Sequence, residues 1–207
     1  MSPHRSLVGC ALVAAVVAPS ASASFVFVSD LGLEQQGAYT GSFDFVQVNA
    51  TTANLVVTLT NISAAANGGY LTAFAFNVAP GMTIAVSMGS GLPHWQALSN
   101  PVDASPLPMF DWGASSSSSW QGGGPPAFGI GVGQTVSTTL VITAAPGVLS
   151  GLTEASFFDA SRTGYAFAAR FRGFENGMSD KVVGIVPAPG ALALLGIAAA
   201  VTRLRRR

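Results

Sequence analysis

Apolar and polar residues alternate with a period of two along most of this chain, which is the spacing of a half-buried β-strand. In residues 43–48, for example, Phe43 and Phe45 share one face and Val46 lies on the other. Short strands separated by turn-forming Gly, Pro and Asn pairs predict an all-β fold, and we expect a single β-sandwich of jelly-roll or immunoglobulin-like type over residues 24–186. Six segments carry this alternation and are rich in strand-favouring residues: residues 43–48, 55–60, 70–78, 82–88, 135–143 and 166–172.

One region interrupts the alternation. Residues 89–133 are rich in Pro, Gly and Ser and include five consecutive serines that begin at Ser115. A stretch of this length without regular structure is uncommon inside a compact domain and is either functional or disordered. We therefore expect a long Pro/Gly/Ser-rich loop at about residues 89–133. Residues 154–160 fit one helical turn and a short strand equally well.

The same region holds all three tryptophans of the chain, Trp95, Trp112 and Trp120. On an exposed loop these rings would stack on sugars, and the domain would be a carbohydrate-binding module. Folded inward, they would anchor the loop over the domain, each burying ~150–250 Å². We favour the anchoring role and keep carbohydrate binding as the alternative function.

The formal net charge of zero conceals an uneven distribution. Residues 24–186 contain nine carboxylates but only four cations, a formal charge of −5 for the predicted domain. An acidic domain without a basic stripe argues against a nucleic-acid partner. The single cysteine, Cys10, lies outside that range, so the domain has no disulfide and its stability depends on burial.

The side chains that catalysis requires are sparse. His94 is the single histidine of the predicted domain, and no Gly-x-Ser-x-Gly motif accompanies it, which argues against a Ser-His-Asp hydrolase and a histidine-ligated zinc site. A glycosidase needs two carboxylates that face a sugar. Carboxylates are available, but their spacing in the sequence does not pair them, so we rank a glycosidase as the third function. Calcium held by Asp103 and Asp111 is possible chemistry, although no Asp-x-Asp-x-Asp loop supports it. We predict a protein without enzymatic activity, metal or cofactor. The candidate glycosidase carboxylates are Asp103, Asp111, Glu154, Asp159 and Glu175.

The first residues have the composition of a secretory signal peptide. A short basic start is followed by an apolar stretch at residues 7–18 and a small-residue site in which Ala21 and Ala23 flank a serine. This pattern predicts a signal peptide over residues 1–23, cleaved after Ala23 by signal peptidase. Cys10 also fits the local pattern of a lipobox, but too little apolar sequence precedes it, so we favour an ordinary place in the apolar stretch.

The last residues combine an uncharged apolar run, residues 191–201, with a basic end. A helix that is apolar all round is buried in protein or in lipid, and flanking arginines favour lipid. Residues 188–202 would span about 22 Å as a helix, against ~30 Å for a hydrocarbon core. We predict a marginal transmembrane helix at about residues 189–202, held by four arginines on its cytoplasmic side: Arg203, Arg205, Arg206 and Arg207. A C-terminal core helix is the alternative.

These C-terminal features resemble the PEP-CTERM sorting signal of bacterial surface proteins. A Pro-x-Pro motif, an apolar stretch with an internal glycine (Gly196) and an arginine cluster follow one another, with Ala188 in the place of the family's glutamate. The motif comprises Val186, Pro187, Ala188, Pro189 and Gly190. Residues 55–78 and 169–184 also look like strand pairs that recur in bodies of such proteins.

The resemblance implies a cellular destination for the protein and does not imply an enzymatic activity. In that family, a membrane-embedded cysteine protease called exosortase cuts near the motif and releases or re-anchors the protein. We therefore expect an exported, non-enzymatic protein of the cell surface or extracellular matrix, anchored in the inner membrane before processing. Its expected partners are the export machinery, signal peptidase, exosortase, the membrane and extracellular polysaccharide.

Overall fold

A computed structural model describes residues 24–30, 32–98 and 100–187, and eleven strands form one antiparallel sheet in it. Three short 3₁₀ segments accompany the strands: η1 (Pro126–Phe128), η2 (Leu149–Gly151) and η3 (Glu154–Phe157). The strands are β1 (Phe25–Ser29), β2 (Tyr39–Gln47), β3 (Thr52–Asn61), β4 (Gly68–Phe76), β5 (Ile84–Ser90), β6 (Gln96–Leu98), β7 (Trp112–Ser115), β8 (Ile130–Gly131), β9 (Thr135–Ala144), β10 (Phe167–Phe174) and β11 (Ser179–Ile185).

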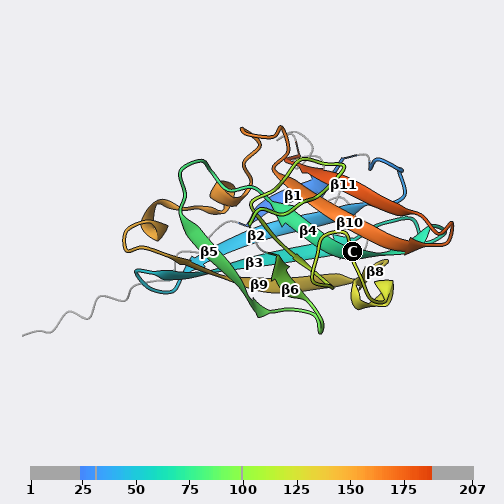
Figure 1. Ribbon diagram of the computed structural model, residues 1–207, viewed down its shortest axis with the longest axis horizontal. Helices are drawn as coiled ribbons and strands as arrows, with labels where there is room; N and C mark the ends of the chain where they lie inside the picture. Colours follow the sequence, from blue (N-terminus) through green and yellow to red (C-terminus); the bar gives the residue numbers. More distant parts are fainter. Residues whose placement is uncertain (1–23, 31, 99, 188–207) are drawn as a thin grey trace, which may run out of the picture.

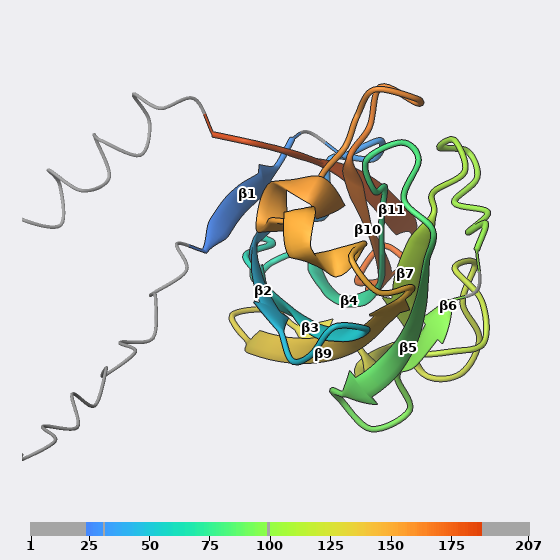
Figure 2. The same cartoon turned by 90° about the vertical axis from the view of Figure 1, so that its left-hand side faces the viewer.

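The sheet curls on itself until it is nearly a closed barrel (Figures 1 and 2). Ten strands follow the order β5-β9-β3-β2-β1-β11-β10-β4-β7-β6, and β8 pairs with β4 beside this path. The predicted all-β class is confirmed. The expected sandwich of two separate sheets is replaced by one sheet, because β1 pairs with β2 on one side and with β11 on the other, through Val28↔Ile185 and Ser29↔Gly184.

Each of the six predicted strands overlaps an observed one, namely β2, β3, β4, β5, β9 and β10. The region predicted as a long loop, residues 89–133, contains β6, β7, η1 and β8. Residues 154–160 begin with the 3₁₀ turn η3, so of the two interpretations left open the helical one is correct. Strands β1, β6, β7 and β8 were not predicted, since they are short or lie where Pro and Gly dominate the composition.

Aromatic rings fill the interior of the barrel. Phe27 lies at the centre, with its ring centroid 4.5 Å from that of Phe167 and 5.0 Å from that of Phe43. Phe74 stacks on Phe167 at 5.8 Å with an interplanar angle of 9°. These four rings come from β1, β2, β4 and β10 and are fully buried. Because the described residues include no cysteine, such burial is the main source of stability.

The segment between β9 and β10 closes one end of the barrel. Figure 2 looks into this end, where η2 and η3 lie across the opening. Leu149 and Phe157 point into the core and are buried, and Leu152 and Phe158 pack against it. The turns therefore act as a plug that keeps water out of the aromatic core.

A second, smaller apolar cluster covers the outer face of β4 and β10. Small residues on these strands, Ala73, Ala75 and Ala168, allow residues 100–121 to approach the sheet closely. Phe110 and Trp120 pack onto these alanines, and both are almost completely buried. Strand β4 is consequently covered on both faces, which explains why its sequence is almost continuously apolar.

The outer face of β2, β3 and β9 is uncovered and rich in hydroxyl groups. Thr58 shares a 2.8 Å hydrogen bond with Ser137, and Thr60 shares one of equal length with Thr135. Both are cross-strand pairs, as their register requires. The chain has no Asp, Glu, Lys or Arg at all in residues 45–102 or 112–153, so this side of the barrel carries almost no charge.

A buried carboxylate holds the segment between β1 and β2 against β11. Asp180 is fully buried. It accepts hydrogen bonds from the backbone N–H groups of Glu34 (2.9 Å), Gln36 (2.9 Å), Gly37 (3.0 Å) and Lys181 (2.8 Å). One side chain on the last strand thus organises the connection that leads from the first strand to the second.

We predict that Asp180→Ala lowers the free energy of unfolding by about 3 kcal/mol, because backbone donors inside the protein lose their acceptor. Glu34→Ala removes an exposed carboxylate from the same connection and is the matched control, with a change within about 0.5 kcal/mol. Urea unfolding of the purified variants measures both values. Equal losses for the two variants would show that the buried carboxylate has no such role.

Candidate functional site

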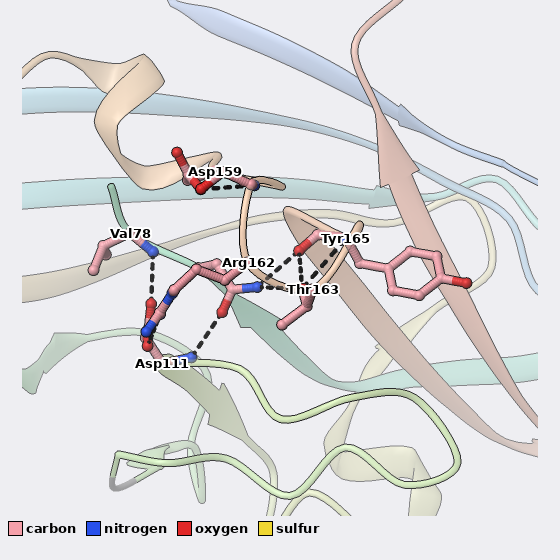
Figure 3. Close-up of polar contacts among 8 residues, drawn as sticks. Val78, Asp111, Asp159, Arg162, Thr163 and Tyr165 are labelled. Atoms are coloured by element: carbon pink, nitrogen blue, oxygen red, sulfur yellow. Dashed lines mark hydrogen bonds and ion pairs between the residues drawn. The ribbon is translucent and has the colours of Figure 1, made fainter. Parts of the chain in front are cut away.

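A polar cluster that links three chain segments lies at the plugged end of the barrel, and Figure 3 shows it. Asp111 is its centre. One carboxylate oxygen accepts the backbone N–H of Val78 at 2.9 Å, and the other accepts a hydrogen bond from the guanidinium of Arg162. The backbone N–H of Asp111 donates to the side-chain oxygen of Asn77 at 3.0 Å.

The sheet topology brings these residues together. Asn77 follows β4, Asp111 precedes β7, and Arg162 lies in the turn before β10, which are three neighbouring strands. Asn77 completes the cluster by donating its amide to the Thr163 hydroxyl (3.0 Å) and to the Tyr165 carbonyl (2.7 Å). Each of these hydrogen bonds links two of the three chain segments. The cluster therefore holds the three segments together at the same end of the sheet.

A cleft of about 200 Å³ lies beside this cluster and includes Asp111, Arg162, Asn100 and Trp112 in its lining. The hydrogen bond and the negative charge of Asp111 raise the pKa of Arg162, and Asp159 adds to the effect. Both oxygens of Asp111 have partners on other segments, so this carboxylate links the segments of the cluster.

The three tryptophans lie at different depths. Trp95 belongs to the main core, 5.8 Å from Phe74 between ring centroids, and its indole N–H donates to the Phe128 carbonyl at 2.9 Å. Trp120 is 2% exposed in the second cluster. Trp112 is partly buried against the main core. Trp95 and Trp120 are therefore buried in the structure, as the anchoring interpretation expects, whereas Trp112 is more accessible.

The remaining candidates for catalysis or metal binding are spread over the domain. Asp103 is exposed and lines a separate cleft of about 240 Å³ with Trp120. Glu154 accepts the backbone N–H of Phe45 at 3.3 Å, whereas Asp159 caps the turn that carries Arg162. Within the described ranges, no three His, Cys, Asp or Glu side chains are grouped to share a metal ion. Two further candidates also lie apart: Glu175 lines a cleft near β4, and His94 stacks on Phe128 with 4.0 Å between ring centroids.

Most residues of the predicted targeting segments lie outside the described residues. This applies to the signal-cleavage residues Ala21 and Ala23, and to the predicted transmembrane helix at 189–202 with its arginines. Of the sorting motif, Val186 and Pro187 are described and follow the end of β11, and Val186 is 51% exposed. No helix in the part of the chain that the structure describes is long and apolar enough to cross a membrane.

Sequence reasoning missed a group of cations on β10 and β11. Arg170 is 8% exposed and donates to the Trp120 carbonyl at 3.0 Å and to the Gln121 carbonyl. The period-two pattern of residues 166–172 is consistent with Arg170 and Arg172 on one face. The burial of Arg170 beneath residues 120–121 depends on tertiary contacts that the pattern does not contain.

Comparisons of this chain with protein-family models, with curated proteins and with solved structures return no match.

We predict that Asp111→Ala destabilises the domain by about 1–3 kcal/mol, because the Val78 N–H is left without its acceptor inside the protein. Arg162→Ala removes only a half-exposed partner and is expected to cost less than about 1 kcal/mol. Asp111→Asn, which keeps an acceptor oxygen, is expected to lie between the two. Urea unfolding measures all three. An Arg162→Ala loss as large as that of Asp111→Ala would mean that the ion pair dominates the cluster.

Proposed function

We propose that this chain is an exported, non-enzymatic surface or matrix protein whose C-terminal segment is a sorting signal of the PEP-CTERM type. The observation that carries the proposal is the position at which the sheet ends. Strand β11 finishes at Ile185, and the motif that resembles the sorting signal begins at the next residue, Val186. The last strand of the described sheet therefore ends before the motif starts.

The first cleavage site lies just before the fold. Ser24 follows the expected signal-peptidase site, and β1 starts at Phe25. Strands β1 and β11 are antiparallel neighbours, with Val28 opposite Ile185, so the two ends of the domain leave the sheet on the same side. Signal peptidase and exosortase would each cut outside the sheet, and neither cut would remove a paired strand.

In this proposal the chain crosses the inner membrane twice during its maturation, each time through a helix that is later removed or released. The signal helix at residues 1–23 directs export. The helix at about 189–202 then holds the protein, with Arg203–Arg207 on the cytoplasmic side. Pro187 and Pro189 disfavour helix in the residues that precede them, and an extended backbone is the form that a protease binds.

We predict that the mature protein ends within or near residues 186–190 when exosortase is present, and keeps Arg207 when the exosortase gene is deleted. Mass spectrometry of the protein from both strains locates the end of the chain. Pro187→Ala combined with Pro189→Ala is expected to reduce processing, since the extended backbone is no longer enforced. Pro146→Ala, in a turn that follows β9, is the matched control. Secreted protein that retains Arg207 in the wild-type host would contradict the proposal.

A further inference from the structure

The cations of the described domain are concentrated in one place. Arg162, Arg170, Arg172 and Lys181 are the four cations in residues 24–187, and three of them lie on neighbouring positions of β10 and β11. Arg170 and Lys181 are direct cross-strand partners, and Arg172 lies two residues from Arg170 on the same face. Figure 1 shows the two strands side by side. A domain with an excess of carboxylates thus has one basic face.

Among the residues that the structure describes, the hydrogen-bond partners of these three cations are uncharged. Arg170 donates to the carbonyls of Trp120 and Gln121, and its Nε has no partner. Arg172 reaches the carbonyls of Gly123 and Gly124 at 3.3 and 3.4 Å. Lys181 donates to the Ser179 hydroxyl at 3.3 Å. Over the described residues, the single ion pair is the one between Arg162 and Asp111, outside this face.

The two guanidinium groups both lie close to Gly122 in the loop that crosses β10. Gly122 has a φ of +85°, and a Cβ placed on it would lie 2.6 Å from Nη1 of Arg170 and 2.8 Å from Nη1 of Arg172. Two like charges held this close repel each other. Burial, and next the charge of Arg172, lower the pKa of Arg170 to about 10, so Arg170 is still protonated at neutral pH.

We propose that Arg170, Arg172 and Lys181 form a binding site for an oxyanion, a carboxylate, sulfate or phosphate group, on the outer face of β10 and β11. An oxyanion at this face relieves the repulsion between the cations and accepts charge-assisted hydrogen bonds. Arg172 and Lys181 are partly exposed and contact the ligand, whereas Arg170 contributes its charge from below. The site is independent of the sorting signal, so either proposal can fail without the other.

Two sources supply this chemistry, a free inorganic anion and the acidic groups of a polysaccharide. Isothermal titration calorimetry of the full-length protein distinguishes them. One arm uses sodium sulfate, and the other uses polygalacturonate, each at constant ionic strength. Saturable binding of sulfate alone identifies a site for free anions. Tighter binding of polygalacturonate per carboxylate identifies an acidic polymer, because neighbouring groups raise the effective concentration at the site.

Substitutions of the exposed cations test the location of the site. We expect Arg172→Gln and Lys181→Gln each to weaken binding by roughly tenfold, the cost of one charge-assisted hydrogen bond. Arg162→Gln is the matched control, since it removes a cation of the same domain away from this face, and its affinity is expected to equal that of the wild type. Urea midpoints confirm that the variants remain folded.

Three outcomes overturn the proposal. The first is that neither probe binds the wild-type protein with a saturable isotherm. The second is that Arg172→Gln and Lys181→Gln, while folded, bind as tightly as the wild type. The third is that Arg162→Gln weakens binding as much as they do, because the effect would then reflect the net charge of the domain instead of a defined site.

Discussion

The pairing of β1 with β11 is the constraint on which the rest of this structure depends. It joins the strands β5-β9-β3-β2-β1 to the strands β11-β10-β4-β7-β6, so that what would be two facing sheets becomes one curled sheet. Residues of η2 and η3 then cover one end of the aromatic core, and β5 and β6 lie close to each other at the two edges of the sheet. A domain without disulfides relies on this closure, because its stability comes from keeping water away from those rings.

Charged side chains serve this fold mainly as partners of the backbone. Asp180 accepts four backbone N–H groups, and Asp111 and Glu154 each accept one from another segment. Arg170 and Arg172 do the reverse and donate to carbonyls of the loop that crosses β10. Loops that contain many Gly, Ser and Pro residues are thereby fixed by polar contacts in addition to the few apolar side chains, such as Trp120, that they bury. The arginines satisfy carbonyl groups but leave their own charge uncompensated, which is what distinguishes this face from the rest of the domain.

Local periodicity predicted most of the long strands, but it did not predict which strands pair with one another. In β3 and β9, buried and more exposed residues alternate along the strand. This alternation is visible in the sequence because the outer faces of the two strands are polar. Strand β7 was not predicted, because Trp112 and Ala114 directly precede a run of serines whose composition suggests a loop. The pairing of β1 with β11 joins residues far apart in the chain, and no local pattern encodes such a contact. The same holds for the candidate site, where Asn77, Asp111 and Arg162 meet only after three strands have paired.

Joining the first strand to the last also sets an order of events during biogenesis. Residues emerge from the ribosome one after another, yet β1 finds one of its two partners only when Ile185 has been synthesised. Non-local pairings of this kind form slowly compared with local ones. The sheet must therefore keep an unpaired edge until the last strand of the domain is available. In the proposed sorting route, retention at the membrane for that interval would give the barrel time to close before the protein is released.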